Sequence, residues 1–157
     1  MILMVEYLIE EEIIEINRLS LESSEEEDEF HVIQPDDVRF IVKFAEERFE
    51  GDLYKKALAY CISLIVTHPF KNGNHRTSLY CSEHFLLKND FVSSVTMEKI
   101  NALQKWRVEY EEKYDLQRDF FNITNIYNDK TRRDEIEKIM NSEYGLKIEE
   151  WLKENYK

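Results

Sequence analysis

The sequence predicts an all-α fold, and three observations support this expectation. The 157 residues include only three glycines and two prolines, whereas sheets and hairpins need more turn-forming residues. Apolar residues make up 43% of the chain, which is enough for one hydrophobic core at this length. Apolar residues also recur at intervals of three and four, the spacing that places them on one face of a helix. We therefore expect residues 1–157 to form a single domain of about six to eight helices.

The first helix is expected over about residues 9–21, where leucine and isoleucine recur at helical spacing. The polar and acidic residues 23–31 that follow are expected to form a loop. Residues 32–33 are apolar and β-branched, and Pro35 disfavours helix directly upstream of itself. We therefore expect a short extended piece before the second helix.

Three further helices are expected between this extended piece and residue 90. The second helix begins near residues 36–37, two aspartates that suit a helix N-terminus, and Gly51 ends it. The third, residues 53–68, is apolar on more than one side and is expected to be central, and Pro69 stops it. The fourth is expected over residues 74–88.

Residues 97–157 are predicted to form a helical C-terminal extension packed on the core. Thr96 is placed to cap the first helix of this extension. Thr131 and Asp134 have the spacing of a capping box, with aspartate in place of the more effective glutamate. Gly145 is expected to break the helix that this box begins.

The charge distribution excludes some classes of partner. Residues 1–50 hold 16 acidic and 4 basic side chains and carry all of the net charge of −12. Nucleic-acid binding requires a basic footprint, so we expect no nucleic-acid partner. The acidic run at residues 25–29 has two interpretations, a solvated loop or a docking surface for a basic partner.

Membrane insertion and secretion are also not expected. No apolar run reaches the ~18 residues of a membrane span, and the N-terminus lacks the basic start of a signal peptide. Cys61 and Cys81 lie among apolar positions and are expected to be buried free thiols. A cytoplasmic location follows from these expectations.

The feature most informative about function is the nine-residue stretch at residues 68–76, which reads HPFKNGNHR. It follows one expected helix and opens the next. The N-terminus of a helix offers free backbone N–H groups and the positive end of the helix dipole to an anion. His68 precedes this loop and Arg76 follows it. A general base on one side and a phosphate-binding cation on the other indicate transfer of a phosphate-containing group to a hydroxyl.

The longer sequence HPFKNGNHRTSL resembles the signature of the Fic/Doc family, the filamentation and death-on-curing proteins. The matching positions are His68, Phe70, Gly73, Asn74, Arg76 and Thr77. Asn72 stands where the family usually has an acidic magnesium ligand. His75 stands where Fic enzymes have glycine and Doc has lysine. Leu79 replaces the second arginine of Fic enzymes, as in Doc, so the sequence is more similar to Doc.

The resemblance covers about residues 7–96 and implies a helical bundle with the signature loop between two core helices. It also implies a flap, such as a short β-hairpin, that lays a target peptide alongside the site. In this arrangement His68 is the catalytic base, Arg76 the phosphate clamp, and the backbone of Gly73 and Asn74 the anion hole.

The remaining loop residues have supporting roles under the same resemblance. Phe70 plugs the loop into the core, and Lys71 has two interpretations, a solvated surface lysine or a positive charge near the phosphates. His75, when protonated, takes the part of Doc's lysine. Asn72 occupies the magnesium position, although an amide oxygen is a poorer magnesium ligand than a carboxylate.

The resemblance therefore predicts a Doc-like toxin-type transferase that moves a phosphate from ATP or another nucleotide, with Mg²⁺, to a serine, threonine or tyrosine hydroxyl of a protein. A small antitoxin protein is the expected inhibitory partner. Two alternatives remain open. One is protein adenylylation, the transfer of AMP by a Fic-type mechanism. The other is a catalytically degenerate binding or adaptor protein, which Asn72 favours.

Overall fold

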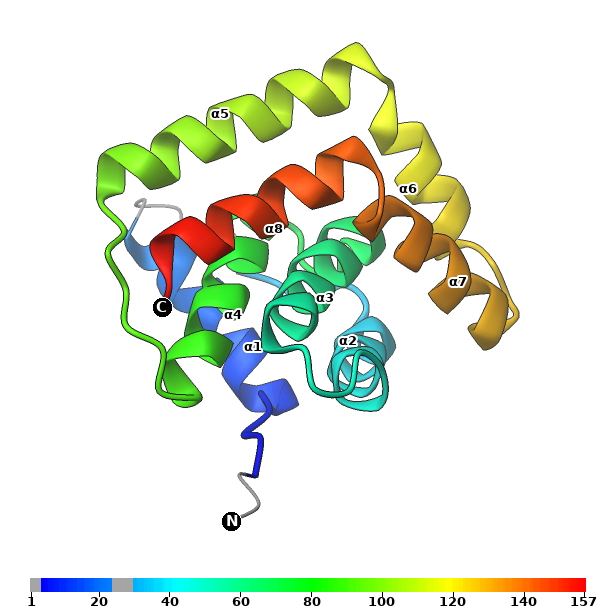
Figure 1. The fold of residues 1–157 in the computed structure, drawn as a ribbon. Helices are drawn as coiled ribbons and strands as arrows, with labels where there is room; N and C mark the ends of the chain where they lie inside the picture. Colours follow the sequence, from blue (N-terminus) through cyan, green and yellow to red (C-terminus); the bar gives the residue numbers. More distant parts are fainter. Residues whose placement is uncertain (1–3, 24–29) are drawn as a thin grey trace.

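The computed structural model describes residues 4–23 and 30–157, and within them the chain forms eight helices (Figure 1). Their bounds are α1 (Glu10–Ser23), α2 (Pro35–Glu47), α3 (Leu53–Thr67), α4 (Asn74–Lys88), α5 (Met97–Lys113), α6 (Leu116–Thr124), α7 (Asp129–Met140) and α8 (Glu143–Asn155). The only β-pairing among the described residues is two isolated antiparallel bridges, Val32 with Phe70 and Ser93 with Tyr156. The prediction of an all-α fold is confirmed.

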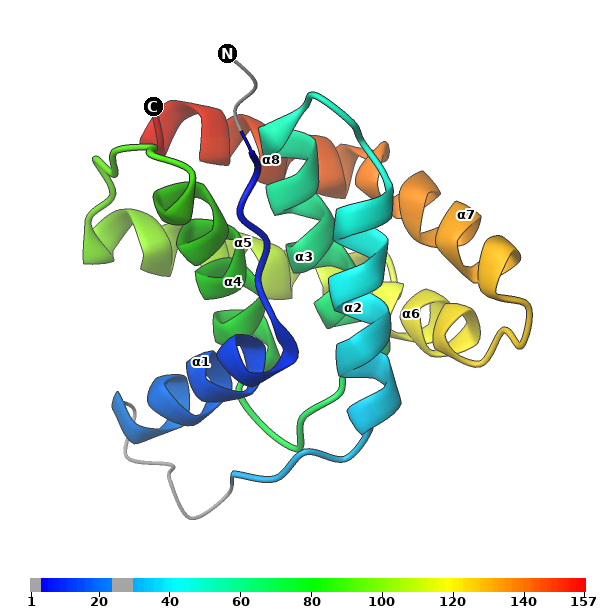
Figure 2. The same cartoon turned by 90° about the horizontal axis from the view of Figure 1, so that it is seen from below.

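α3 is the central helix. It contacts α2, α4, α6, α7 and α8, and α8 lies between α3 and α5 in Figure 1. Every residue from Lys56 to Thr67 is buried, which explains why this segment is apolar on several sides. The side opposite α8 is covered by α2, while α1 packs against α4 (Figure 2). The ends of α3 and α4 that the signature loop joins are thus held by neighbouring helices.

The end of α2 differs from the prediction that Gly51 terminates it. α2 ends at Glu47, because Arg48 adopts an extended conformation with φ −126° and ψ 162°. The last carbonyl groups of a helix have no partner within the helix. At the C-terminal end of α2, the ammonium of the buried Lys56 of α3 donates to three such carbonyl oxygens. These acceptors belong to Ala45 (3.0 Å), Glu46 (3.2 Å) and Arg48 (2.7 Å). A side chain of the next helix, rather than the glycine, therefore fixes this end.

The predicted capping box at Thr131 and Asp134 is wrong. α7 begins two residues before Thr131, and Asn128 caps it by accepting a hydrogen bond of 2.9 Å from the Thr131 backbone N–H. The Asp134 carboxylate instead contacts Arg48 at 3.2 Å and Lys130 at 3.1 Å. Asparagine is as good a cap as threonine or better, so the earlier site is the one used.

The prediction that Gly145 breaks a helix is wrong. This glycine lies buried in the first turn of α8. A Cβ atom at this position would lie 2.2 Å from the carbonyl oxygen of Met140 and 2.5 Å from that of Ile139. Glycine is therefore needed because the start of α8 packs directly on the end of α7. The two helices form a tight corner that no larger residue can occupy.

Three further expectations concern the cysteines, the acidic run and membrane insertion. Cys61 and Cys81 are buried and unpaired, as predicted. The acidic run at residues 25–29 lies outside the described part of the chain. Within residues 4–23 and 30–157, no helix combines the length and apolar character needed to cross a membrane.

Replacing Gly145 with alanine should destabilise the protein, although Gly→Ala within a helix ordinarily stabilises it by up to ~1 kcal/mol. The added methyl group would overlap two backbone oxygens that cannot move independently of α7. We expect a loss of about 2 kcal/mol in the free energy of unfolding, measured by chemical denaturation. Glu150→Ala, at an exposed position of the same helix, should change it by less than about 0.5 kcal/mol. Equal effects of the two variants would contradict the packing argument.

Candidate active site

The signature loop begins and ends with left-handed backbone conformations. His68 follows α3 with φ 55° and ψ 55°, and its backbone N–H donates to the Leu64 carbonyl oxygen at 2.9 Å. Gly73 precedes α4 with φ 77° and ψ 16°. A Cβ atom on Gly73 would also approach Cδ2 of Leu21 to 3.0 Å, so glycine is favoured there by conformation and by space. These two turns reverse the chain and fix where α4 begins.

Asn74 closes the loop through its side chain. Its Oδ1 accepts from the Phe70 backbone N–H at 3.2 Å, and its Nδ2 donates to the Phe70 carbonyl oxygen at 2.8 Å. The Phe70 side chain is fully buried, and Asn74 is 4% exposed. Since both polar groups of a buried residue need partners, this one amide satisfies them together. The Asn74 side chain thus holds the loop, and only its backbone N–H is left for an anion.

An extended segment, residues 31–34, runs antiparallel to the loop (Figure 2). The carbonyl oxygen of His31 accepts from the Lys71 backbone N–H at 3.0 Å. The Pro69 carbonyl oxygen accepts from the N–H groups of Ile33 (2.8 Å) and Gln34 (3.1 Å). The predicted extended piece at residues 32–33 is therefore present, and it pairs with the loop itself. Residues 24–29, where the rest of an expected hairpin would fall, lie outside the described chain.

Asn17 of α1 is a loop contact that the sequence analysis did not identify. Its Nδ2 donates to the Asn72 carbonyl oxygen at 2.9 Å and to the Thr77 hydroxyl at 3.0 Å. Asn17 is fully buried, four residues from both Ile13 and Leu21 on the apolar face of α1. A polar residue within an apolar stripe was the available signal, because a buried amide needs partners.

Three backbone N–H groups at the start of α4 remain available. Within the described chain, no group accepts a hydrogen bond from the backbone N–H of Gly73, Asn74 or His75. They lie at the positive end of the α4 dipole, and Arg76 follows in the first turn with a half-buried side chain. Lys71 is exposed. This arrangement is suited to a phosphate group.

His68 has a defined tautomer. Its Nδ1 lies 3.2 Å from the Ile65 carbonyl oxygen, which can only accept, so Nδ1 carries the proton. In the neutral ring Nε2 is therefore an unprotonated base. The ring is open to solvent in part, but burial of the rest lowers the pKa of His68 below its ordinary value. His75 lowers this pKa further, and the Ile65 carbonyl and Glu111 raise it in part. At neutral pH the ring is in the basic form.

His75 is held by a buried carboxylate. Its Nε2 lies 2.9 Å from both carboxylate oxygens of Glu111 in α5, which is 2% exposed. Burial alone would raise the pKa of Glu111, but hydrogen bonds from His75 and Tyr144 and the charge of Arg107 lower it overall. Glu111 is thus ionised at neutral pH. The His75 ring is engaged by this carboxylate rather than left to bind a phosphate.

The described residues do not form a metal site of their own. No group of three or more histidine, cysteine, aspartate or glutamate side chains in the described chain has an arrangement that would hold a metal ion. Asn72, at the predicted magnesium position, offers an amide in place of a carboxylate. These residues do not fit a protein-built magnesium centre.

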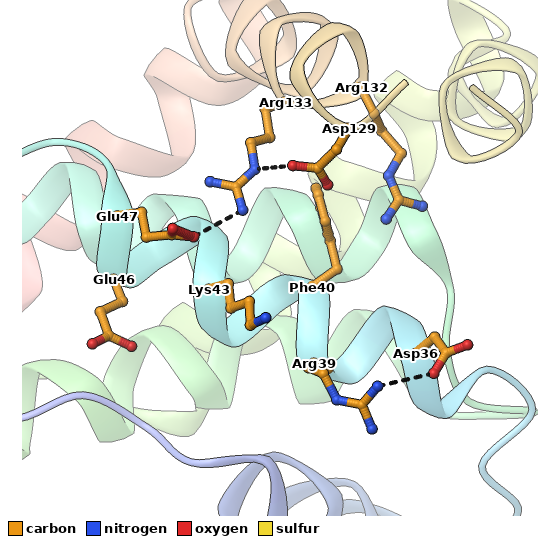
Figure 3. A pocket seen from close by; sticks show the side chains of 9 residues that line it. All are labelled: Asp36, Arg39, Phe40, Lys43, Glu46, Glu47, Asp129, Arg132 and Arg133. Atoms are coloured by element: carbon orange, nitrogen blue, oxygen red, sulfur yellow. Dashed lines mark hydrogen bonds and ion pairs between the residues drawn. The ribbon is translucent and has the colours of Figure 1, made fainter. Parts of the chain in front are cut away.

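A separate cavity of about 680 Å³ lies between α2 and α7 (Figure 3). Its lining residues are Asp36, Arg39, Phe40, Lys43, Glu46, Glu47, Asp129, Arg132 and Arg133. Arg133 contacts both Glu47 (2.9 Å) and Asp129 (2.8 Å), and Arg39 contacts Asp36 at 3.2 Å. None of these residues belongs to the signature loop. Arg132 pairs instead with Asp37, outside the lining, at 3.1 Å. The four basic and four acidic lining side chains balance, so the cavity offers no net charge to a ligand.

Comparison with known proteins identifies the family to which this loop belongs. Residues 7–86, which include α1 to most of α4, match the Fic/DOC family. The chain belongs to the Fic/DOC family. Members of this family generally catalyse nucleotide-dependent modification of proteins, so a transferase-type function on proteins is indicated. No curated protein and no solved structure matches the chain.

Asn74→Ala should destabilise the protein strongly, because it leaves the buried N–H and C=O of Phe70 without partners. We expect a loss of about 3 kcal/mol in the free energy of unfolding by chemical denaturation. Asn74→Asp should be no better, since one carboxylate oxygen would then face the Phe70 carbonyl oxygen. Asn122→Ala, an exposed asparagine of α6, serves as the control. Wild-type stability of the Asn74→Asp variant would contradict the argument that both hydrogen bonds from the Asn74 side chain to Phe70 hold the loop.

Proposed function

We propose that this Fic/DOC protein transfers a phosphate from ATP or another nucleotide to a hydroxyl group of a protein, with His68 as the general base. The observation that carries the proposal is the tautomer of His68, whose Nδ1 is committed to the Ile65 carbonyl oxygen. Nε2 is then the atom that accepts a proton from the attacking hydroxyl. The hydroxyl oxygen forms a new bond to phosphorus, and the nucleoside diphosphate leaves with the electrons of the broken P–O bond.

The start of α4 binds the phosphates in this proposal. The N–H groups of Gly73, Asn74 and His75 and the positive end of the helix dipole stabilise negative charge on the transferred group. Arg76 and Lys71 add full positive charges. Mg²⁺ enters with the nucleotide, because the protein does not supply a carboxylate ligand at position 72.

Residues 31–34 position the target protein. They are extended and pair with the loop along one edge. An extended segment of a target can add to the other edge through main-chain hydrogen bonds, which brings a serine, threonine or tyrosine side chain toward His68. A small antitoxin that covers this surface would inhibit the enzyme, and both proteins would act in the cytoplasm.

The contact between His75 and Glu111 favours a second candidate, the transfer of AMP. The similarity to Doc suggested that a protonated His75 replaces Doc's lysine, which is associated with phosphate transfer. Glu111 engages the His75 ring at 2.9 Å, so this ring is poorly placed for that role. The remaining support for phosphate transfer is the Doc-like sequence that continues through Thr77 and Leu79. A third candidate, a binding protein without catalysis, rests on Asn72 alone.

Incubation of a target-containing lysate with α-labelled and γ-labelled ATP tests the two reactions. Protein labelled only from the γ position supports phosphate transfer, and protein labelled from the α position supports AMP transfer. No His68-dependent label from either nucleotide, together with no ATP binding, would leave the binding protein as the answer.

His68→Ala should reduce the rate of labelling by about 10²–10⁴-fold, which is the usual contribution of a general base. His84→Ala is the matched control, because this exposed histidine of α4 pairs with Glu12 at 3.1 Å and lies outside the signature loop. The wild-type rate should fall at acid pH as His68 becomes protonated. Since the pKa of His68 is lowered, activity should persist below pH ~6.5, where an ordinary histidine is half protonated. A His68→Ala enzyme of full activity would exclude base catalysis by this residue.

Asn72→Asp should tighten the binding of magnesium–ATP, because a carboxylate attracts the cation more strongly than an amide dipole. The change is nearly isosteric, so the fold should tolerate it. Calorimetric titration with ATP in the presence and absence of Mg²⁺ measures the effect. Asn122→Asp adds the same charge at an exposed position of α6 and should leave the affinity unchanged. If Asn72→Asp does not increase the effect of Mg²⁺ on the ATP affinity, position 72 does not contact the metal.

A further inference from the structure

A buried polar network connects the first turn of α4 to the C-terminal helices. The side chains in it are His75 of α4, Gln104, Arg107 and Glu111 of α5, Gln117 of α6, and Tyr144 of α8. All except His75 lie outside residues 7–86, the part of the chain that matches the family. The network is therefore a feature of this chain that the family match does not describe.

The imidazole ring and the backbone carbonyl oxygen of His75 are both bound by side chains of α5. Glu111 binds the imidazole at 2.9 Å, and Tyr144 donates to the same carboxylate at 2.7 Å. The His75 carbonyl oxygen accepts from Nη1 of Arg107 and from Nε2 of Gln104, each at 3.1 Å. Side chain and backbone of one residue are thus fixed by a single neighbouring helix.

Arg107 connects these contacts into one unit. It is fully buried, and besides His75 it donates to the Tyr144 hydroxyl at 3.1 Å and to Oε1 of Gln104 at 3.0 Å. Removing a guanidinium and a carboxylate from water is costly, and only close pairing and complete hydrogen bonding offset this cost. Nη2 of Arg107 has no hydrogen-bond partner among the described residues, so the offset is partial and depends on the nearby charge of Glu111. Removal of either charge therefore leaves the other less compensated and disturbs the contacts to His75.

We propose that Glu111 is a positioning residue of the phosphate site and acts through His75. The proposal rests on the function proposed above, in which the N–H groups of residues 73–75 bind the phosphates. His75 carries the last of these three N–H groups, so the direction in which they point depends on how the first turn of α4 is held. Glu111 and Arg107 hold that turn through the side chain and the carbonyl oxygen of His75. The C-terminal helices are accordingly part of the site and not only a cover for α3.

The test compares two buried glutamates of the full chain. Glu111→Gln removes the charge that binds His75, while Glu149→Gln removes a similar buried charge that pairs with Lys55 at 2.6 Å and Lys153 at 3.2 Å, away from α4. Calorimetry with magnesium–ATP gives the affinity, and backbone amide NMR follows residues 73–75 during the same titration. Thermal unfolding gives the stability of each variant.

We expect Glu111→Gln to weaken ATP binding about tenfold or more and to reduce the shifts of the three amides on titration. Glu149→Gln should lose stability but keep wild-type affinity to within about twofold. Unchanged affinity in Glu111→Gln, or equal losses of affinity in both variants, would overturn the positioning role. If the wild-type protein itself does not bind ATP, the proposed function fails, which is a different result from wild-type binding with an unaffected variant.

A double-mutant cycle tests whether Glu111 acts through His75. If it does, His75→Ala and Glu111→Gln should have effects on ATP affinity that do not add. Additive effects would mean that Glu111 acts by another route and would contradict the proposal. Gln104→Ala provides a milder variant if Glu111→Gln does not fold, since Gln104 is half-buried and supplies one donor to the His75 carbonyl. It should weaken ATP binding in the same direction, and wild-type affinity in it would count against the proposal.

Discussion

The amide of Asn74 is the contact on which the rest of the site depends. The loop between α3 and α4 has to bury Phe70, and the backbone of a buried residue needs hydrogen-bond partners. Asn74 supplies both partners four residues later, which closes the loop on itself and sets the first residue of α4. Without this closure, His68 at one end of the loop and the helix terminus at the other would have no fixed relative position.

The backbone N–H groups of the loop divide into two sets with different tasks. Those of Phe70 and Lys71 are used within the protein, by Asn74 and by the His31 carbonyl oxygen. Those of residues 73–75 are not accepted by any described group. The first set holds the loop to the core and to the extended segment. In the proposed function, this fixed loop keeps the second set oriented for an anion without a cost of reorganisation.

Much of the fold could be predicted because its information is local. Apolar periodicity predicted α4 with its observed bounds and the central place of α3. Pro69 and Gly73 located the loop between these two helices. The errors arose where the deciding contact is made by a neighbouring helix. Lys56 fixes the end of α2 from another helix, and Gly145 is required by the end of α7 rather than by a helix break.

The candidate site shows the same division between local and distant information. The motif singled out His68, Gly73 and Asn74 as candidates, because the loop and the helix terminus are formed by consecutive residues. The role of the Asn74 side chain and the contacts of Asn17 were not found, since a motif does not state which atoms of a residue are used. Glu111 lies 36 residues from His75 and gives no signal in the sequence. Only the packing of α5 against the start of α4 brings the two together.

The acidity of the chain does not conflict with an anion site. The net charge of −12 comes from the N-terminal third, and interactions between exposed charges decline over about 8 Å at physiological ionic strength. The groups that favour an anion at the start of α4 are the N–H groups of residues 73–75 and the positive end of the helix dipole. The buried carboxylate of Glu111 is engaged by His75 and Tyr144, and the charge of Arg107 also acts on it. A site that is locally positive can therefore exist on a protein that is acidic as a whole.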